Sequence, residues 1–320
     1  MTSAESTIPV DVAAALSPAD LAAVLDLVAA VTDEDRIKPF SDQALLHLLA
    51  GPESTLQHLL ARRNGRLAGY ALVDTSDPAA TGVELAVAPA DRQVGVATAL
   101  VQKLLEVAPD APIRLWAHGD PPGGARLAER FDFQRSRSLW QMRRSLQEPL
   151  PDLTVPEGIR IRPFVVGSDE TAWTALNNRA FASHPEQGRW TVRDVELRER
   201  EPWFDADGFL LAERTDPTGP PGSSDGELVA FHWTKVHDRD VDGPPETRGR
   251  PIGEVYVVGV APEAAGRGLG RVLTLAGLHH LRDGGLPAVL LYVDEDNSAA
   301  IRTYERLGFI RHSTDVQYSR

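Results

Sequence analysis

The feature that most constrains the fold of this chain is an internal repeat. Val87-Ala-Pro89 recurs as Val260-Ala-Pro262 at an offset of 173 residues, and Gly95 recurs as Gly268 at the same offset. Further along, Phe133 matches Phe309 and Gln141 matches Gln317, both at an offset of 176. A near-constant offset over a long stretch predicts two copies of one domain.

The length agrees with this duplication, since 320 residues correspond to two domains of about 150 residues each. The proline-rich segment 148–158 separates the copies and precedes a predicted strand at Ile159-Arg-Ile-Arg162. We therefore expect an N-terminal domain over residues 1–148, a linker over 149–158 and a C-terminal domain over 159–320.

Hydrophobic periodicity gives both halves the same order of elements. Ser17-Pro-Ala-Asp20 is typical of a helix start, and two apolar runs around Asn64-Gly65 predict a hairpin. Each half then has a buried strand, a glycine-containing turn and a helix. The second half adds a strand at 289–293, a helix at 299–307 and a strand at 315–318. The pattern predicts an α/β fold, a mixed sheet flanked by helices.

Composition excludes several classes of function. The net charge of −13 disfavours binding to nucleic acid or to an anionic membrane, which requires a basic surface. Cysteine is absent, which excludes disulfides, thiolate metal sites and a cysteine nucleophile. The histidines form no metal-binding motif, so we predict no metal. Without a signal peptide or an apolar run long enough for a membrane span, we expect a cytoplasmic monomer.

The turn between strand and helix carries the first chemistry. Arg92-Gln-Val-Gly-Val-Ala97 and Ala265-Gly-Arg-Gly-Leu-Gly270 each follow an apolar strand and open a helix. The first backbone N–H groups of a helix have no partner within the helix and attract an anion, and glycine permits the close approach of a phosphate. A tight turn without a ligand is the alternative, which the matched register of two copies disfavours.

These motifs resemble those of the GCN5-related N-acetyltransferases. Arg92-x-x-Gly95-x-Ala97 resembles the pyrophosphate loop of that family, and Asn297-x-x-Ala300-x-x-x-Tyr304-x-x-x-Gly308-Phe309 resembles its later helix. Ala265 departs from the family pattern, which has Gln or Arg at this position, so a modest loss of binding is expected. The resemblance covers nearly the whole chain and implies two tandem domains of this family.

Further stretches resemble tandem members of the family whose acceptor is a cysteinyl-glucosaminyl-inositol. They are His184-Pro-Glu-Gln-Gly188, Phe231-His-Trp-Thr-Lys-Val-His237, Gly253-Glu-Val-Tyr-Val-Val-Gly-Val260 and Leu290-Leu-Tyr-Val-Asp-Glu-Asp-Asn297. The resemblance implies transfer of an acetyl group from acetyl-CoA to the free cysteinyl amine of this small thiol. An α-amino group is partly protonated at neutral pH, so a base is needed.

The resemblance assigns roles to individual residues. Glu254 is the expected general base and Tyr304 the expected general acid toward the leaving thiolate, while backbone N–H groups of Val258–Val260 face the thioester oxygen. Acceptor-binding positions are Asp42, Glu186, Lys235, Glu254 and Tyr292. Cofactor-binding positions in the C-terminal half are Val258, Gly259, Val260, Ala265, Gly266, Arg267, Gly268, Leu269, Gly270, Arg271, Asn297, Ser298, Ala299, Ala300, Ile301 and Arg302. Those in the N-terminal half are Leu85, Ala86, Val87, Gln93, Val94, Gly95, Val96, Ala97 and Thr98.

The two halves differ at the expected catalytic positions. At the offset of 173, Glu254 corresponds to Thr81, and at 176 Asn297 corresponds to Pro121 and Tyr304 to Ala128. We therefore expect the C-terminal domain to catalyse and the N-terminal domain to bind acetyl-CoA without turnover.

Other interpretations stay open from the sequence. Glu254 is also compatible with a salt bridge at a strand end, Tyr304 with helix packing, and Lys235 with a solvated surface position. Two other functions are an acetyltransferase for a different amine, such as an aminoglycoside or a protein N-terminus, and a CoA-binding regulator without catalysis.

Overall fold

The computed structural model describes residues 8–51, 54–109, 111–182, 187–215 and 226–320. Contacts within the chain divide it into two compact units. The first unit comprises Met1–Trp140 together with Ser313–Arg320, and the second comprises Gln141–His312.

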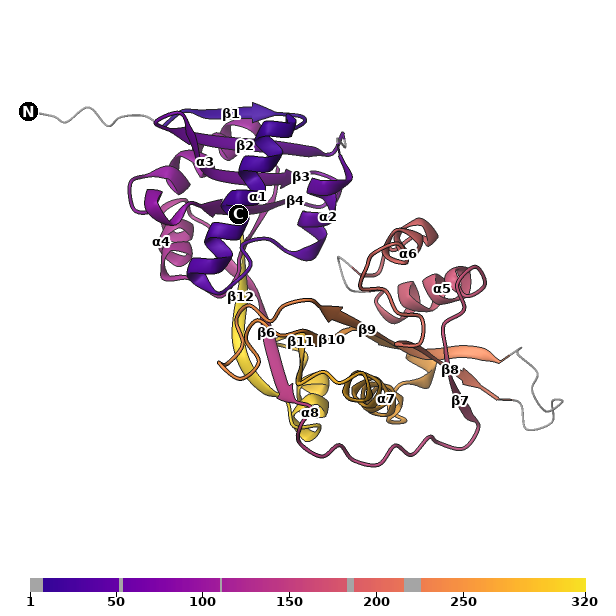
Figure 1. Ribbon diagram of the computed structural model, residues 1–320. Coiled ribbons are helices and arrows are strands. Elements are labelled where there is room, and N and C mark those ends of the chain that lie inside the picture. The colour runs from indigo at the N-terminus through magenta and orange to yellow at the C-terminus, as the bar shows by residue number, and fades with distance from the viewer. Residues whose placement is uncertain (1–7, 52–53, 110, 183–186, 216–225) are drawn as a thin grey trace, which may run out of the picture. The chain divides into compact units, whose positions relative to one another are not determined.

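The first unit alternates hairpin strands with helices, as the periodicity predicted (Figure 1). Asn64 and Gly65 adopt the left-handed conformation and join β2 to β3 in a tight hairpin. Ser17 accepts a hydrogen bond from the backbone N–H of Asp20 and caps α1. The elements that lie wholly in this unit are β1 (Val10–Ala13), α1 (Pro18–Asp35), α2 (Asp42–Ala50), β2 (Leu56–Arg63), β3 (Arg66–Asp74), β4 (Thr81–Val87), the short helix η1 (Pro89–Asp91), α3 (Val96–Val107), β5 (Ile113–Ala117) and α4 (Pro122–Arg130).

Helices cover both faces of the first unit's sheet. Helices α1 and α2 pack through Val24, Leu27 and Leu48 on one face, where Tyr70 and Leu72 are buried. On the other face α3 and α4 cover a second core, which includes Leu59, Val73, Leu100, Leu104, Phe133 and Val316. This arrangement follows from the alternation of side chains along each strand, which gives each helix pair its own apolar face.

The second unit repeats this plan. Figure 1 shows α5 and α6 on one side of its sheet and α7 and α8 on the other. Its elements are β7 (Ile159–Pro163), α5 (Glu170–Ala180), α6 (Val192–Arg198), β8 (Phe209–Arg214), β9 (Glu227–His237), β10 (Ile252–Val260), η2 (Pro262–Ala264), α7 (Leu269–Asp283), β11 (Ala288–Asp294) and α8 (Ser298–Arg306).

Aromatic side chains dominate the core of the second unit. Trp173 of α5 makes edge contacts with Phe231 and Trp233, and Trp233 stacks on Phe209 with ring centroids 4.2 Å apart. Trp173, Phe209, Phe231 and Trp233 have no exposed surface. On the opposite face, His232 is buried against α7 and its Nδ1 lies 2.8 Å from the carbonyl oxygen of Leu273.

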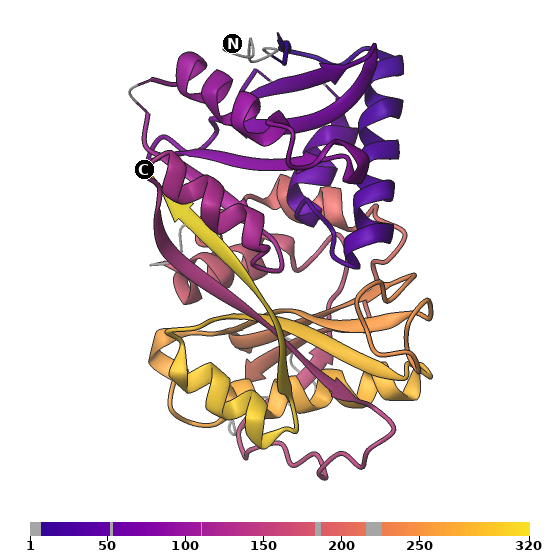
Figure 2. The same ribbon diagram turned by 90° about the vertical axis from the view of Figure 1, so that its left-hand side faces the viewer.

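Two long strands contribute to both units. Strands β6 (Gln134–Ser145) and β12 (Ile310–Ser319) lie side by side (Figure 2). In the first unit β12 pairs with β5, so that the strand order is β1-β2-β3-β4-β5-β12, and in the second unit the order is β6-β11-β10-β9-β8-β7. The chain therefore passes between units at Trp140/Gln141 and at His312/Ser313, whereas the sequence placed one boundary in residues 149–158.

The mixed α/β architecture expected from the sequence is confirmed in both units. Strands β4 and β5 pair in parallel, as do β10 and β11, while the hairpin strands pair antiparallel. Within the described residues, no helix combines the length and hydropathy that spanning a bilayer requires.

Candidate active site

A break in strand pairing opens the sheet of the second unit. Parallel pairing of β10 with β11 runs from Gly253↔Val289 to Val255↔Leu291, and no described residue of β10 beyond Val255 pairs with β11. The backbone of Val257–Val260 therefore faces an opening between the two strands on this side. Free N–H groups along such an edge can donate hydrogen bonds to an acyl oxygen or to an amide carbonyl of a ligand.

A β-bulge lies at the start of this opening. Val255 pairs with Thr234 of β9 and Val257 pairs with Trp233, so Tyr256 is an extra residue on β10. A bulge bends its strand and increases the local twist, which explains why β10 and β11 separate here. Gly259 lies within the opened segment, and a Cβ at this position would come within 2.4 Å of the Phe231 ring. Close packing on Phe231 thus requires glycine there.

The loop after β10 has the geometry of an anion site. Gly266 and Gly268 both have φ of 78°, and Gly268 caps α7 without a side-chain hydrogen bond to the helix. The first N–H groups of α7 are therefore available to a ligand, and the helix dipole favours negative charge at this end. Arg267 and Arg271 are exposed beside them. These groups fit the pyrophosphate of a CoA molecule.

The first unit has the same loop conformation. Gln93 and Gly95 have φ of 60° and 95°, at the positions that correspond to Gly266 and Gly268. A left-handed conformation is unfavourable for Gln93 by about 1 kcal/mol, so the shared geometry is maintained against a local preference. Gly95 caps α3, again without a side-chain hydrogen bond. Arg92 does not add free positive charge, because its guanidinium forms two hydrogen bonds of 2.7 Å with Asp35.

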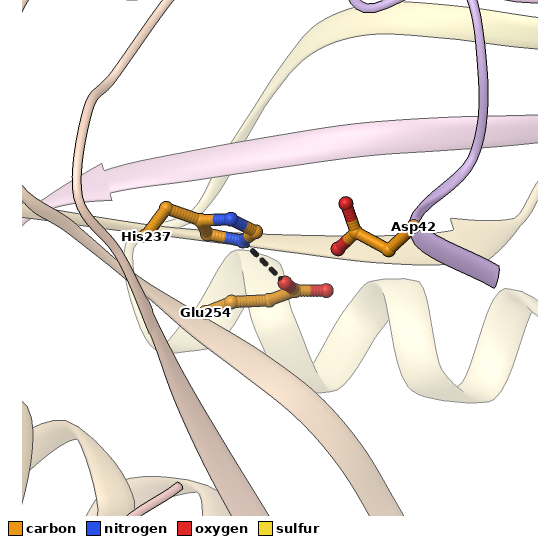
Figure 3. A group of neighbouring side chains, drawn as sticks. All are labelled: Asp42, His237 and Glu254. Atoms are coloured by element: carbon orange, nitrogen blue, oxygen red, sulfur yellow. Dashed lines mark hydrogen bonds and ion pairs between the residues drawn. The ribbon is translucent and has the colours of Figure 1, made fainter. Parts of the chain in front are cut away.

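Three residues from neighbouring strands meet on the α5/α6 face of the second unit. Glu254 of β10 lies directly opposite Lys235 of β9 in the strand register. The Nε2 atom of His237 lies 2.6 Å from Oε2 of Glu254 (Figure 3). Both partners are largely covered, with 15% and 8% of their side chains exposed. Lys235 and Glu254, two of the expected acceptor-binding residues, thus lie together, and His237, which no sequence motif singled out, lies beside them.

Lys235 is a buried residue rather than a solvated one. Only 6% of it is exposed, and its Nζ atom lies 4.7 Å from the ring centre of Trp203 and 5.2 Å from that of Tyr256. The negative faces of these rings attract the ammonium group. The surface interpretation of Lys235 is therefore wrong, and the aromatic rings give this lysine a fixed place beside Glu254.

Tyr292 of β11 is held by a polar network. Gln141 Nε2 donates hydrogen bonds of 3.1 Å to Tyr292 Oη and to an oxygen of Asp242. Arg143 in turn donates to Gln141 Oε1 at 2.7 Å and pairs with both Asp240 and Asp242. Asp240 is fully buried. Gln141 matches Gln317 in the internal repeat. This match is the signal in the sequence that points to the network.

Helix α8 carries the remaining predicted residues of the second unit. Asn297 caps it, and its side-chain oxygen accepts a hydrogen bond of 3.2 Å from the N–H of Ala300. Tyr304 lies in the last turn, with its ring 5.8 Å from that of Phe309. Burial raises the pKa of Tyr304 to about 12, because the phenolate loses solvation. Ser298, Ala299, Ala300, Ile301 and Arg302 form the first turns of α8.

The bulge changes one correspondence between the halves. In the first unit β4 pairs with β3 from Gly82↔Asp74 to Gly69↔Val87 without a shift. Since β10 has the extra residue Tyr256, Glu254 corresponds to Gly82 and not to Thr81 as the constant offset implied. Strand pairing agrees, because Gly82 pairs with Arg114 as Glu254 pairs with Leu290. The first unit lacks a carboxylate at this position under either correspondence.

The opening in the first unit holds a different cluster. Pairing of β4 with β5 ends at Glu84↔Trp116. The imidazole of His118 bridges two carboxylates, with Nε2 3.1 Å from Glu84 and Nδ1 3.0 Å from Asp315 of β12. Burial opposes protonation, but the hydrogen bonds and charges of Asp315 and Glu84 outweigh it and raise the pKa of His118 to about 10. His118 is thus an imidazolium that donates to both carboxylates.

The other predicted positions have the following places. Asp42 is the first residue of α2 in the first unit and forms an ion pair of 3.3 Å with Lys38. Glu186 lies outside the described residues. Leu85, Ala86 and Val87 end β4, and Val94, Val96, Ala97 and Thr98 lie in the following loop and the start of α3. Ala265, Leu269 and Gly270 frame the corresponding loop of the second unit.

Comparison with known proteins identifies the family. Residues 24–133 and 174–309 match the Acetyltransferase (GNAT) family. The chain is 50% identical over 304 residues to a mycothiol acetyltransferase from Thermobispora bispora, covering 95% of this chain and 97% of the relative. It is 51% identical over 308 residues to a mycothiol acetyltransferase from Salinispora arenicola, covering 95% and 94%.

Solved structures show the same fold. A GCN5-related N-acetyltransferase from Sphaerobacter thermophilus superposes with a TM-score of 0.69 at 26% identity, covering 98% of this chain and 96% of that one. A tandem GNAT protein from the clavulanic acid biosynthesis pathway superposes with a TM-score of 0.70 at 19% identity, covering 98% of both chains. The tandem arrangement expected from the repeat is therefore confirmed.

Proposed function

Because the chain belongs to the GNAT family and is an acetyl-CoA-dependent N-acetyltransferase, we propose that it makes mycothiol. Its acceptor is the free cysteinyl amine of cysteinyl-glucosaminyl-inositol, and its products are mycothiol and CoA. The observation that carries the proposal is the sequence identity of about 50% along 95% of the chain to mycothiol acetyltransferases. The polar residues on the α5/α6 face of the second unit support it.

The acceptor side of the reaction uses Glu254 as the base. The incoming amine is an ammonium in part at neutral pH, and it must lose a proton before its nitrogen can attack the thioester carbon. Glu254 has one oxygen bonded to His237 and takes the proton on the other. Lys235 and Tyr292 provide a cation and a hydroxyl for the polar acceptor, with Asp42 and Glu186 as further binding residues.

The cofactor side uses the opened strand and the loop before α7. Bound acetyl-CoA supplies the activated acyl group, and the N–H groups that begin α7 hold its pyrophosphate. Backbone N–H groups of Val258–Val260 stabilise the negative charge on the thioester oxygen during attack. The C–S bond breaks as the amide forms, and Tyr304 donates its phenolic proton to the departing thiolate.

The first unit binds acetyl-CoA without transferring its acetyl group. The loop geometry at Gln93 and Gly95 supports binding. The positions that correspond to Glu254 and Tyr304 are Gly82 and Ala128, which can move no proton. This division of labour makes the second unit the only catalytic one of the two.

The test is the product formed from acetyl-CoA and purified cysteinyl-glucosaminyl-inositol, identified by mass spectrometry. The proposal expects one added acetyl group, located on the cysteinyl nitrogen by fragmentation, together with an equal amount of free CoA. An aminoglycoside and a peptide with a free N-terminus serve as competing acceptors. Faster acetylation of either competitor would show that this competitor is the acceptor in place of cysteinyl-glucosaminyl-inositol. Acetylation of sulfur instead of nitrogen would contradict the mechanism.

A further inference from the structure

We propose that His237 is a positioning residue for Glu254, which fixes the orientation of the carboxylate so that one oxygen is presented to the acceptor amine. The inference rests on the proposed function of Glu254 as the base. It assigns a role to a residue that touches neither the acceptor nor acetyl-CoA in the proposed mechanism.

The strand register brings the two side chains together. On the antiparallel pair β9–β10, Glu254 lies opposite Lys235 and Ile252 lies opposite His237. His237 and Glu254 are therefore diagonal neighbours on one face of the sheet, a separation that long side chains can bridge. The bridge is short, with 2.6 Å between Nε2 and Oε2.

The hydrogen bond to Oε2 leaves Oε1 of Glu254 as the oxygen that can take a proton. An imidazole N–H that donates to Oε2 occupies that oxygen and restricts a side chain that otherwise rotates about three bonds. Oε1 has no hydrogen bond to any described residue of the second unit. A base must lie within hydrogen-bond reach of the proton that it removes, so fixing Oε1 bears directly on the rate.

His237 is itself held in place by the folded loop that follows it. The backbone N–H of Asp240 donates to the carbonyl of Arg250 at 2.7 Å, and the N–H of Gly249 donates to the carbonyl of Asp240 at 2.8 Å. The carboxylate of Asp240 also binds Arg143 and Thr247. The end of β9 therefore has little freedom, and the imidazole reaches Glu254 from a rigid support.

The experiment compares variants of the full chain under saturating acceptor. H237L removes the donor, H237Q keeps a side-chain N–H near the place of Nε2, and H237N carries an amide too short to reach Glu254. H280L is the matched control, because His280 also bonds a carboxylate, Asp205, at 2.8 Å on a helix of the same unit. Thermal unfolding confirms that each variant is folded.

The expected result is a fall in kcat of about 10- to 100-fold for H237L, which is the factor that a hydrogen bond to a charged group is worth. KM for acetyl-CoA should stay within about twofold of the unsubstituted enzyme, H237Q should recover most of kcat, and H280L should be unaffected. Adding H237L to E254Q should cause no further loss, because both changes act on the same step.

Three results would overturn the proposal: an unchanged kcat in H237L, equal activity of H237Q and H237N, or a full additional loss in the double variant. If H237L does not fold, the comparison of H237Q with H237N decides alone. E254Q separates the two levels of inference. An active E254Q contradicts the proposed function of Glu254, whereas an impaired E254Q beside a normal H237L contradicts only the role of His237.

Discussion

In the proposed reaction three side chains of the second unit act together, and each is held by a neighbour from another part of the fold. Glu254 bonds His237, Lys235 lies against the rings of Trp203 and Tyr256, and Tyr292 accepts a hydrogen bond from Gln141. The family resemblance identifies Glu254, Lys235 and Tyr292, because a motif specifies residue types along the chain. The neighbours His237, Tyr256 and Gln141 come from strand pairing and Trp203 comes from the loop between α6 and β8, and neither becomes known before the sheet is built.

At the residue scale we predict unequal roles for Glu254 and Tyr304. E254Q should lower kcat by about 100-fold or more, since it removes the base. Y304F should lower kcat by less than about tenfold, because a thiol with an ordinary pKa near 8.5 is a good leaving group and needs little help. The raised pKa of Tyr304, about 12, keeps the phenol protonated but makes it a weak acid. Steady-state kinetics of both variants check this, and equal or reversed losses would count against the assignment.

At the scale of elements, the bulge in β10 is what distinguishes the two copies. A constant offset of 173 between the halves pairs Glu254 with Thr81. Because of the extra residue Tyr256, the residues of β10 that precede it shift by one position relative to those of β4. The strand, loop and helix around each anion site could be predicted from glycine, proline and periodicity. The bulge could not, since it depends on how β10 meets β9 and not on a local preference of Tyr256.

The second prediction concerns the glycine-containing loop before α7, whose conformation recurs before α3. G268A should raise KM for acetyl-CoA several-fold and leave kcat nearly unchanged, because φ of 78° strains alanine by about 1–2 kcal/mol. Apart from the adjoining backbone, no described residue has an atom within 4 Å of the added Cβ, so the expected cause is strain in the loop. G158A is the matched control, with φ of 75° and the same open surroundings. A similar rise of KM in G158A would refute the assignment.

The cluster at His118 joins elements of the first unit and gives a third prediction. It connects β4 through Glu84, the cap of α2 through Ser41, and β12 through Asp315. The folded chain binds the His118 proton more tightly than the unfolded chain does. The stability that it contributes is therefore complete below about pH 6.5 and is lost as the pH rises toward 10.

Denaturant unfolding across pH 6.5–9.5 measures this loss. The unfolding free energy should fall by up to about 1.4 kcal/mol per pH unit from this group. The slope should become flatter in H118Q, which has no titrating proton. Identical slopes in the two proteins would show that folding does not raise the pKa of His118.

At the scale of the whole molecule, the repeat in the sequence predicted two similar folds, and the two compact units agree with it. What the repeat did not reveal is that each unit takes strand residues from the other half of the chain. Val316 and Tyr318 are buried in the core of the first unit, and Met142 and Leu146 are buried residues of the second. Alternation of apolar and polar residues along such strands predicts which side chains are buried. It does not predict which unit they pack into.

This sharing of strands predicts the behaviour of a cut chain. A protease site placed in the exposed segment 151–155 should give two pieces that stay together on size-exclusion chromatography and separate only in denaturant. Each piece would hold residues needed by the other's core, 141–148 in one case and 313–320 in the other. Separation in native buffer would contradict the exchange. An uncut chain with the same insertion is the control.

The placement of β12 also sets an order for folding during protein synthesis. The ribosome makes the chain from its N-terminus, so residues 8–140 are available first, yet β12, the strand that lies beside β5, is made after every other described element. Residues 141–312 can complete the second unit before that point. The unit that is translated first is therefore the one completed last, and until then the edge of β5 is open to pairing with other chains.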